Sequence, residues 1–192
     1  MNTLFLKFSE LAREAFAFLN EEFGFRGRLE AEGLLRFERE DMFVLISYDA
    51  RRSYELTLEI GRKQKMPERV FNFGELLRSV NAPNIPSSYQ VTSENFLKFY
   101  LDKLAYSLRY YCTSILHNDA MALARLDKLR NIESAEFELA SRLRRVREAV
   151  DVAWPARDYK AIVKALKSIE PHLSPSEKKR LEYSQKKLSH SH

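Results

Sequence analysis

MFVLISYDARRSYELTLEI, residues 42–60, is the stretch that decides the fold of this chain. Its first five residues are all apolar, which is typical of a central strand covered on both sides. From Tyr54 to Ile60 apolar and polar side chains alternate, as they do in a strand with one buried and one wet face. The polar link 49–53 is too short for a crossover helix. The stretch therefore predicts an antiparallel hairpin.

The flanking sequence extends this hairpin into a sheet with a helix on one face. Residues 35–38 alternate apolar and charged side chains, which predicts a preceding strand, and a short fourth strand fits residues 28–31. Upstream, apolar residues recur at steps of three and four from Phe5 to Phe23, and Gly24 is suited to end the helix that this spacing predicts. We expect one long N-terminal helix packed on a meander of three or four strands.

Helical periodicity returns after an irregular connection. Residues 63–91 hold three prolines and only one short helical pattern, from Phe73 to Val80. Thr92 is placed to cap a long helix, and the apolar residues that follow it share one face of that helix. The expected inward stripe is Phe96, Tyr100, Leu104, Leu108, Cys112 and Ile115.

Further helices complete the chain. A helical pattern covers residues 121–132, and Ser134 is placed to cap another helix through Val152. Pro155 then interrupts the pattern before a helical hairpin that has the shape of a single tetratricopeptide-like helix pair, without a second copy. The two helices of this hairpin are expected at residues 156–169 and 176–188.

These elements predict an α+β fold with an uneven distribution of charge. An N-terminal helix, the antiparallel sheet and a connecting loop occupy residues 1–91, a helical layer of the same domain occupies 92–154, and a basic helical hairpin appendage occupies 155–192. Residues 1–154 carry 23 Lys and Arg against 23 Asp and Glu, whereas 155–192 carry 9 against 4. The net charge of +5 therefore sits in the appendage.

The sequence shows none of the common signatures of catalysis or cofactor binding. Its five glycines form no phosphate-binding loop, and its four histidines and one cysteine do not stand at metal-ligand spacing. Cys112 lies in an apolar helical pattern and is expected to be a buried thiol. We predict no catalytic residue, cofactor or metal, and a site assembled from residues distant in sequence stays open. Short apolar runs and the absence of an export signal predict a cytoplasmic protein without a membrane span.

The turn of the central hairpin is the favoured site for a protein partner. Its residues combine one acid, two arginines and two tyrosines on a short segment expected to be exposed. Arg and Tyr are over-represented among the residues that dominate binding energy at protein interfaces. The other interpretation is a polar loop without a partner. The candidate partner-binding residues are Tyr48, Asp49, Arg51, Arg52 and Tyr54.

Nucleic acid is the alternative partner. The densest basic run is Arg142, Arg144, Arg145 and Arg147, and Tyr106, Tyr110 and Tyr111 supply aromatic rings on an earlier helix. Basic residues with aromatic rings can hold a nucleic-acid strand. Glu138 and Glu148 stand four residues from Arg142 and Arg144, so ion pairs along the helix are expected to neutralise part of the run.

Three segments resemble small uncharacterised bacterial proteins, some of which look like immunity proteins of polymorphic toxin systems. They are residues 18–25 (FLNEEFGF), 44–56 (with SYD and RSYEL) and 104–119 (ending in ILHND). Where that class has glycine before the final aspartate, this chain has Asn118, which tolerates a left-handed turn. The resemblance implies a cytoplasmic α+β binding protein and carries over no catalytic residue. The expected function is a non-enzymatic protein-binding module of the toxin-neutralising kind; the alternative is a nucleic-acid-associated regulator.

Overall fold

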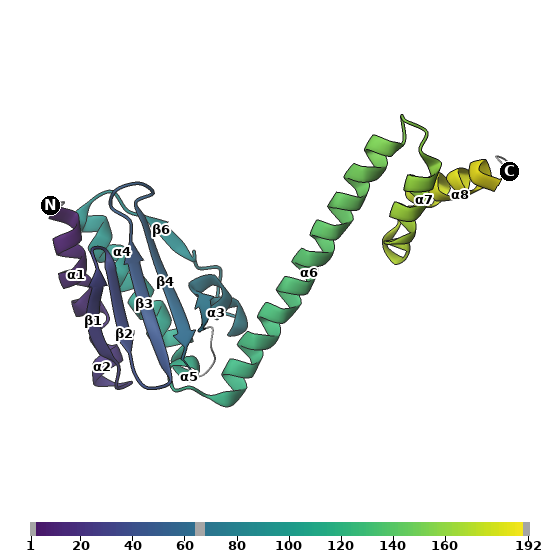
Figure 1. Cartoon of the computed structure of the whole chain (residues 1–192). Coiled ribbons are helices and arrows are strands. Elements are labelled where there is room, and N and C mark those ends of the chain that lie inside the picture. Colours follow the sequence, from purple (N-terminus) through teal and green to yellow (C-terminus); the bar gives the residue numbers. More distant parts are fainter. Residues whose placement is uncertain (1–2, 64–67, 190–192) are drawn as a thin grey trace. The chain divides into compact units, whose positions relative to one another are not determined.

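The computed structural model describes residues 3–63 and 68–189, with side chains from Lys7 onward (Figure 1). The Phe5 side chain, part of the first helical pattern, lies outside this range. The chain forms two compact units, Met1–Arg130 (unit 1) and Asn131–His192 (unit 2). The division lies inside a helix, well before the Pro155 interruption at which the appendage was expected to begin.

Unit 1 is built on an antiparallel sheet, and the predicted α+β class is confirmed. Its strands run in the order β1-β2-β3-β4-β5, and β6 pairs with the start of β4. The sheet thus has six strands where three or four were expected, because the short β5 and β6 lie in the segment interpreted as a connection. The strands are β1 (Arg26–Ala31), β2 (Leu34–Glu38), β3 (Met42–Tyr48), β4 (Glu55–Arg62), β5 (Arg69–Asn72) and β6 (Ser88–Gln90).

Helices α1 (Thr3–Ala15) and α4 (Glu94–Tyr111) pack against each other and cover one face of the sheet (Figure 1). The single N-terminal helix that the apolar period predicts is broken, because the chain turns at residues 16–17 before the short helix α2 (Phe18–Glu21). Gly24 follows with a φ of +70°, and the Asn20 amide closes the turn by donating to the Phe25 carbonyl at 2.8 Å. The turn brings Phe18 and Phe25 into the same core as α1.

The opposite face of the sheet, here called the open face, is closed by side chains. Phe43 points to this face and is buried although it is not on the helix side. Its ring lies across Gly61 of the neighbouring strand, where a Cβ atom would be 1.9 Å from the ring. The guanidinium carbon of Arg36 lies 3.7 Å from the ring centroid on the other side. The apolar run of β3 is thus covered by a helical layer on one face and by an arginine on the other.

Polar contacts hold helix α3 against the first part of α6 (Ala120–Ala153) in unit 1. Helix α3 (Phe73–Ser79) begins with a capping box between Asn72 and Glu75. Both carboxylate oxygens of Glu75 also accept hydrogen bonds from Arg130 of α6, at 2.6 and 2.5 Å. Burial disfavours the charged form of Glu75, but the hydrogen bonds from Arg130 and the Asn72 backbone outweigh it and lower the pKa of this carboxyl.

Unit 2 packs the C-terminal part of α6 against a helical hairpin. The hairpin consists of α7 (Tyr159–Lys167), a 3-10 turn (Glu170–His172) and α8 (Pro175–Ser189), close to the ranges predicted. Its buried side chains meet Val150 of α6 in one small core. The hairpin is therefore not a separate appendage, because the end of the expected helical layer belongs with it. Helix α6 is also continuous through Ser134, where a helix start was expected.

Candidate functional site

The predicted recognition turn lies between β3 and β4, and Asp49 builds it. The Asp49 carboxylate accepts hydrogen bonds from the backbone amides of Arg51, Arg52 and Ser53 at 3.0 to 3.2 Å. These bonds, with that of Ser53 first, lower the pKa of Asp49. Tyr54 ends the turn with a left-handed φ of +53°. Asp49 is therefore occupied in holding the turn together.

Three of the five candidate residues, Arg51, Arg52 and Tyr54, are exposed, and the expectation of an exposed turn is wrong for Tyr48. Tyr48 is only 2% exposed, and its hydroxyl donates to the Val91 carbonyl at 2.7 Å. Arg51 reaches back to the turn between β1 and β2 and pairs with Glu32 at 2.5 Å. The side chains of Arg52 and Tyr54 are exposed as well.

A shallow depression of about 530 Å³ lies beside this turn, between the ends of β2, β3 and β4. Most of its polar lining is already paired: the hydroxyls of Ser47 and Thr57 are 2.5 Å apart, and Arg51 and Asp49 have the partners described above. Among the described residues, the carboxylate of Glu55 in this lining has no hydrogen-bond or ion-pair partner that would orient it for acid or base chemistry. The depression thus has the properties of a surface hollow rather than of an active site.

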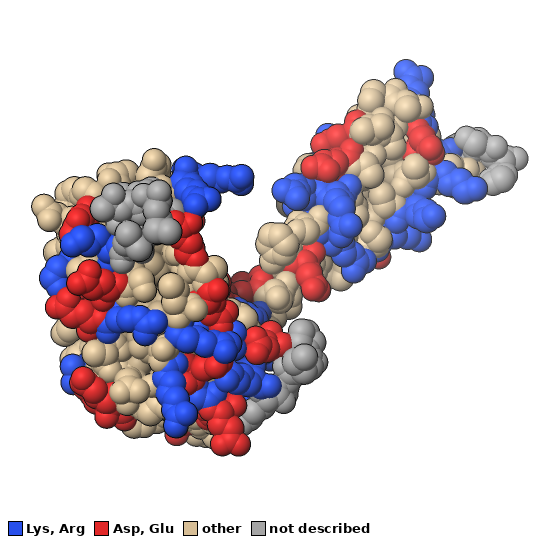
Figure 2. Space-filling view, turned by 60° about the vertical axis from the view of Figure 1, so that its left-hand side comes forward, with Lys and Arg blue, Asp and Glu red and all other residues tan. Residues whose placement is uncertain are grey.

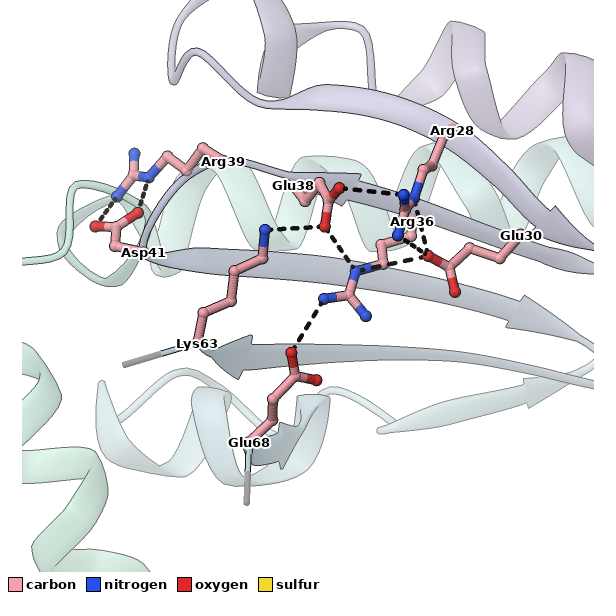
Figure 3. A network of polar contacts seen from close by, with 8 residues as sticks. All are labelled: Arg28, Glu30, Arg36, Glu38, Arg39, Asp41, Lys63 and Glu68. Carbon is pink, nitrogen blue, oxygen red and sulfur yellow. Dashed lines mark hydrogen bonds and ion pairs between the residues drawn. The ribbon is translucent and has the colours of Figure 1, made fainter. Parts of the chain in front are cut away.

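The open face carries a chain of alternating charges (Figure 3). Arg36 stands at its centre, between Glu30, Glu38 and Glu68. Glu38 also pairs with Lys63 at 2.9 Å, and the hydrogen bond from Lys63 is the main cause that lowers the Glu38 pKa. Figure 2 shows acidic and basic side chains interleaved on the visible face of unit 1. The carboxylates of Glu30, Glu38 and Glu68 are neutralised by cationic side chains, and no described group of three acidic, His or Cys side chains on this face is arranged to hold a metal.

The described residues offer no other centre for chemistry. Among them, no three His, Cys, Asp or Glu side chains are grouped as metal ligands, and no helix is long and apolar enough to cross a membrane. Cys112 is fully buried, as predicted, and burial raises the pKa of its thiol to about 12. Asp119 caps α6 by accepting from the Ala122 amide at 2.8 Å and does not orient a catalytic histidine.

A row of exposed aromatic side chains on α4 is the most unusual surface of unit 1. Phe96, Phe99, Tyr106 and Tyr110, here called the aromatic stripe, are between 56% and 65% exposed. They are separated by three, seven and four residues, so they lie along one side of the helix. Large aromatic side chains are costly to leave in water, and contiguous exposed patches of them mark interaction sites. The expected placement of Phe96 on the inward stripe is wrong, because this side chain is exposed, whereas the placement of Leu104 and Leu108 on that stripe is confirmed.

Neighbouring rings hold the aromatic stripe in place. Tyr106 and Tyr110 stack with their centroids 5.7 Å apart and their planes 9° from parallel. Tyr100 contacts both Phe96 and Phe99, and its ring stacks on that of Tyr89 of β6 with the centroids 4.3 Å apart. The rings of Tyr100 and Tyr89 therefore connect the Phe96 and Phe99 end of the stripe to the sheet. Side chains that are already held in place lose less conformational entropy when a partner binds.

The stripe ends in a depression of about 450 Å³. Tyr106 and Tyr110 form one wall, and Phe23, which packs against the His117 ring at 4.8 Å, forms another. Arg109 and Glu22 at the rim form an ion pair with each other. The depression therefore offers aromatic walls with no net charge, which suits an apolar side chain.

The basic run on α6 is partly used inside unit 2. Arg147 pairs with Glu177 of α8 at 2.7 Å, and Arg142 donates to the Ser168 carbonyl. The expected pairs of Arg142 with Glu138 and of Arg144 with Glu148 do not form among the described residues. Tyr106 and Tyr110 belong to unit 1, so the rings and the arginines are parts of different compact units.

Comparisons with known proteins add no functional information. No family model, no curated protein and no solved structure matches this chain. The resemblance to immunity proteins therefore stays a prediction, and the aromatic stripe with its depression is the candidate site on geometry alone.

Proposed function

We propose that this protein is a non-enzymatic protein-binding module that holds its partner on the aromatic stripe of α4. The exposure of four large aromatic side chains on one side of one helix carries this proposal. Aromatic residues are enriched at protein interfaces, where their burial supplies most of the binding free energy. The depression beside Tyr106 and Tyr110 provides the pocket that an anchoring side chain of the partner would fill.

The charge of unit 1 favours a protein over a nucleic acid as the ligand of this surface. Residues 1–130 carry 19 Lys and Arg against 18 Asp and Glu. Binding to nucleic acid depends mainly on positive charge that neutralises phosphates, whereas the four residues of the stripe are uncharged, with Lys103 between Phe99 and Tyr106 in the sequence. Residues 131–192 of unit 2 carry 13 Lys and Arg against 9 Asp and Glu, so most of the excess positive charge lies away from the exposed rings in sequence.

The predicted turn can contribute to the same interface. Val91, which lies just before α4, links the turn to this helix. Its carbonyl accepts a hydrogen bond from the Tyr48 hydroxyl, and its amide donates to the Tyr54 carbonyl at 2.7 Å. A partner on the first turns of α4 could therefore also reach Arg52 and Tyr54. In the toxin-neutralising form of the proposal, the partner is a toxin whose activity is blocked by this covering in a stoichiometric complex.

The test is to identify partners captured by the whole chain in its native host and then reconstitute the complex from purified components. The double variant Phe99→Ser with Tyr110→Ser should lose the partner, with affinity reduced at least about 100-fold as for the loss of two anchors. Leu29→Ser is the matched control, because Leu29 is 50% exposed on β1 and lies outside the stripe. Circular dichroism checks that both variants keep the fold.

Two outcomes would count against the proposal. A reconstituted partner that binds the stripe variant as tightly as it binds the original chain would place the interface elsewhere. The absence of any stoichiometric protein partner in the host, with the fold intact, would remove the reason to regard the chain as a binding module.

A further inference from the structure

We infer that the aromatic stripe receives an amphipathic helix of a different protein, with an acidic side chain placed opposite Lys103. This inference rests on the proposed function and specifies the kind of partner. Three observations carry it: the spacing of the exposed residues, the charge at their centre and the depression at their end.

The spacing fits a helix as the partner. Phe96, Phe99, Lys103, Tyr106 and Tyr110 follow one another at steps of three, four, three and four. This is the heptad pattern of a seam between two helices that pack at a small left-handed crossing angle. The seam from residue 96 to residue 110 is about 21 Å long at 1.5 Å per residue, so about four turns of a partner helix would cover it.

The central charge selects the partner. Lys103 is exposed, and its ammonium lies 5.5 Å from the Tyr89 ring centroid. Within the described part of the chain it forms no ion pair, in contrast to Lys98 and Arg109 on the same helix. Burying an ammonium at an interface without a partner is costly, whereas a carboxylate opposite it restores the balance. A partner that covers the stripe is therefore expected to bring an acid to this point.

The position of Lys103 also argues against a second copy of this chain. Lys103 is the midpoint between residues 96 and 110, so a two-fold pair that uses the whole stripe places Lys103 against its own copy. This holds for a parallel pair and for an antiparallel pair alike. Like charges facing each other at the centre of an interface oppose that assembly.

The depression supplies the second specificity element. Tyr106 and Tyr110, which form one of its walls, lie about one and two turns from Lys103 along α4. An apolar side chain of the partner helix, one or two turns from the acid, would fill it. The recognition pattern is thus an acid at the centre of an apolar helix face and a large anchor to one side.

Two synthetic helical peptides test the charge rule. Both have 21 residues and leucine at the seam positions, and they differ only at the central seam position, which is Glu in one and Lys in the other. The central position faces Lys103 in either orientation of the peptide. Fluorescence anisotropy with the full chain should show the Glu peptide binding about 10-fold more tightly than the Lys peptide.

The variant Lys103→Glu should reverse this preference. Lys128→Glu is the matched control, because Lys128 is an exposed lysine on α6 outside the stripe, and it should leave the preference unchanged. Raising the salt concentration should reduce the ratio of the two affinities without abolishing binding, because the apolar seam is not screened.

The outcomes separate this inference from the proposed function. Equal binding of both peptides that is lost in the Phe99→Ser with Tyr110→Ser variant would overturn the charge rule and leave the stripe as the docking surface. Failure of both peptides to bind would overturn the helical partner. Self-association of the chain in sedimentation, dispersed by the same double variant, would assign the stripe to a second copy and also overturn the inference.

Discussion

Gly61 and Phe43, which face each other across β3 and β4, set how the centre of the open face packs. Any side chain at position 61 would enter the space of the Phe43 ring, because a Cβ atom there is 1.9 Å from it. We predict that Gly61→Ala lowers the free energy of unfolding by about 1–3 kcal/mol through overpacking. Urea denaturation followed by circular dichroism measures the change.

A compensating variant makes this prediction specific. In a Phe43→Leu background the flat ring is absent, so Gly61→Ala should lower the free energy of unfolding by markedly less than it does when Phe43 is present. The double-mutant cycle isolates the contact between the two residues. If the cost is the same in both backgrounds, Gly61 is required for a reason other than the ring.

Single residues of the candidate site were predicted with mixed success. The Tyr48 side chain lies on the same face of β3 as Val44 and Ile46, so the period of two already placed it inside. The Asp49 side chain was identified correctly as part of a turn, but its bonds to three backbone amides could not be inferred from residue type alone. Ion pairs between different parts of the sheet, such as that of Arg51 with Glu32, depend on strand register and could not be predicted from the sequence.

At the scale of elements, the continuity of α6 can be tested with two alanine substitutions. Asp119 caps the helix at its start, whereas Ser134 lies inside it. We predict that Asp119→Ala lowers the unfolding free energy by about 1 kcal/mol, and that Ser134→Ala has no cost because alanine favours a helix interior. Urea denaturation of both variants provides the measurement. A loss of similar size at Ser134 would mean that two helices meet there.

The sequence predicted the long strands and most of the helices, and it failed where elements are short or have two apolar faces. Strands β5 and β6 have four and three residues, too few for a periodic pattern, and they are held by pairing with β4. Helix α4 has aromatic residues beside its leucine face, so its apolar arc is wide and period alone does not tell which part of that arc faces the sheet. That excess of aromatic residues on a single helix was the available signal for the aromatic stripe.

At the scale of the whole molecule, unit 2 contains the only tryptophan, Trp154, which reports on the unfolding of that unit. The hydrogen bond from Arg147 is the main cause that lowers the Glu177 pKa from its ordinary value of 4.5 to about 2. The pair therefore stabilises the folded unit fully above about pH 4.5, and the contribution is lost as the pH falls toward 2. Stability measured by Trp154 fluorescence in urea should fall across this range.

The variant Arg147→Met separates this pair from general acid effects. It should lower the unfolding free energy of unit 2 by about 1 kcal/mol at pH 7, a modest loss because the pair is partly exposed to solvent. Near pH 2 the loss should be much smaller, because protonation of Glu177 already weakens the pair there. An equal loss at both pH values would show that Arg147 stabilises the unit through packing of its side chain rather than through its charge.

The contact among Arg36, Phe43 and Gly61 has a consequence for how this surface can evolve. The three residues come from three adjacent strands, and the ring of Phe43 fills the space above Gly61 and lies under the guanidinium of Arg36. A smaller residue at 43 would free position 61 to carry a side chain, and an uncharged residue at 36 would leave the ring uncovered. In a set of relatives, these three positions should therefore covary, although one of them has the appearance of an ordinary surface charge.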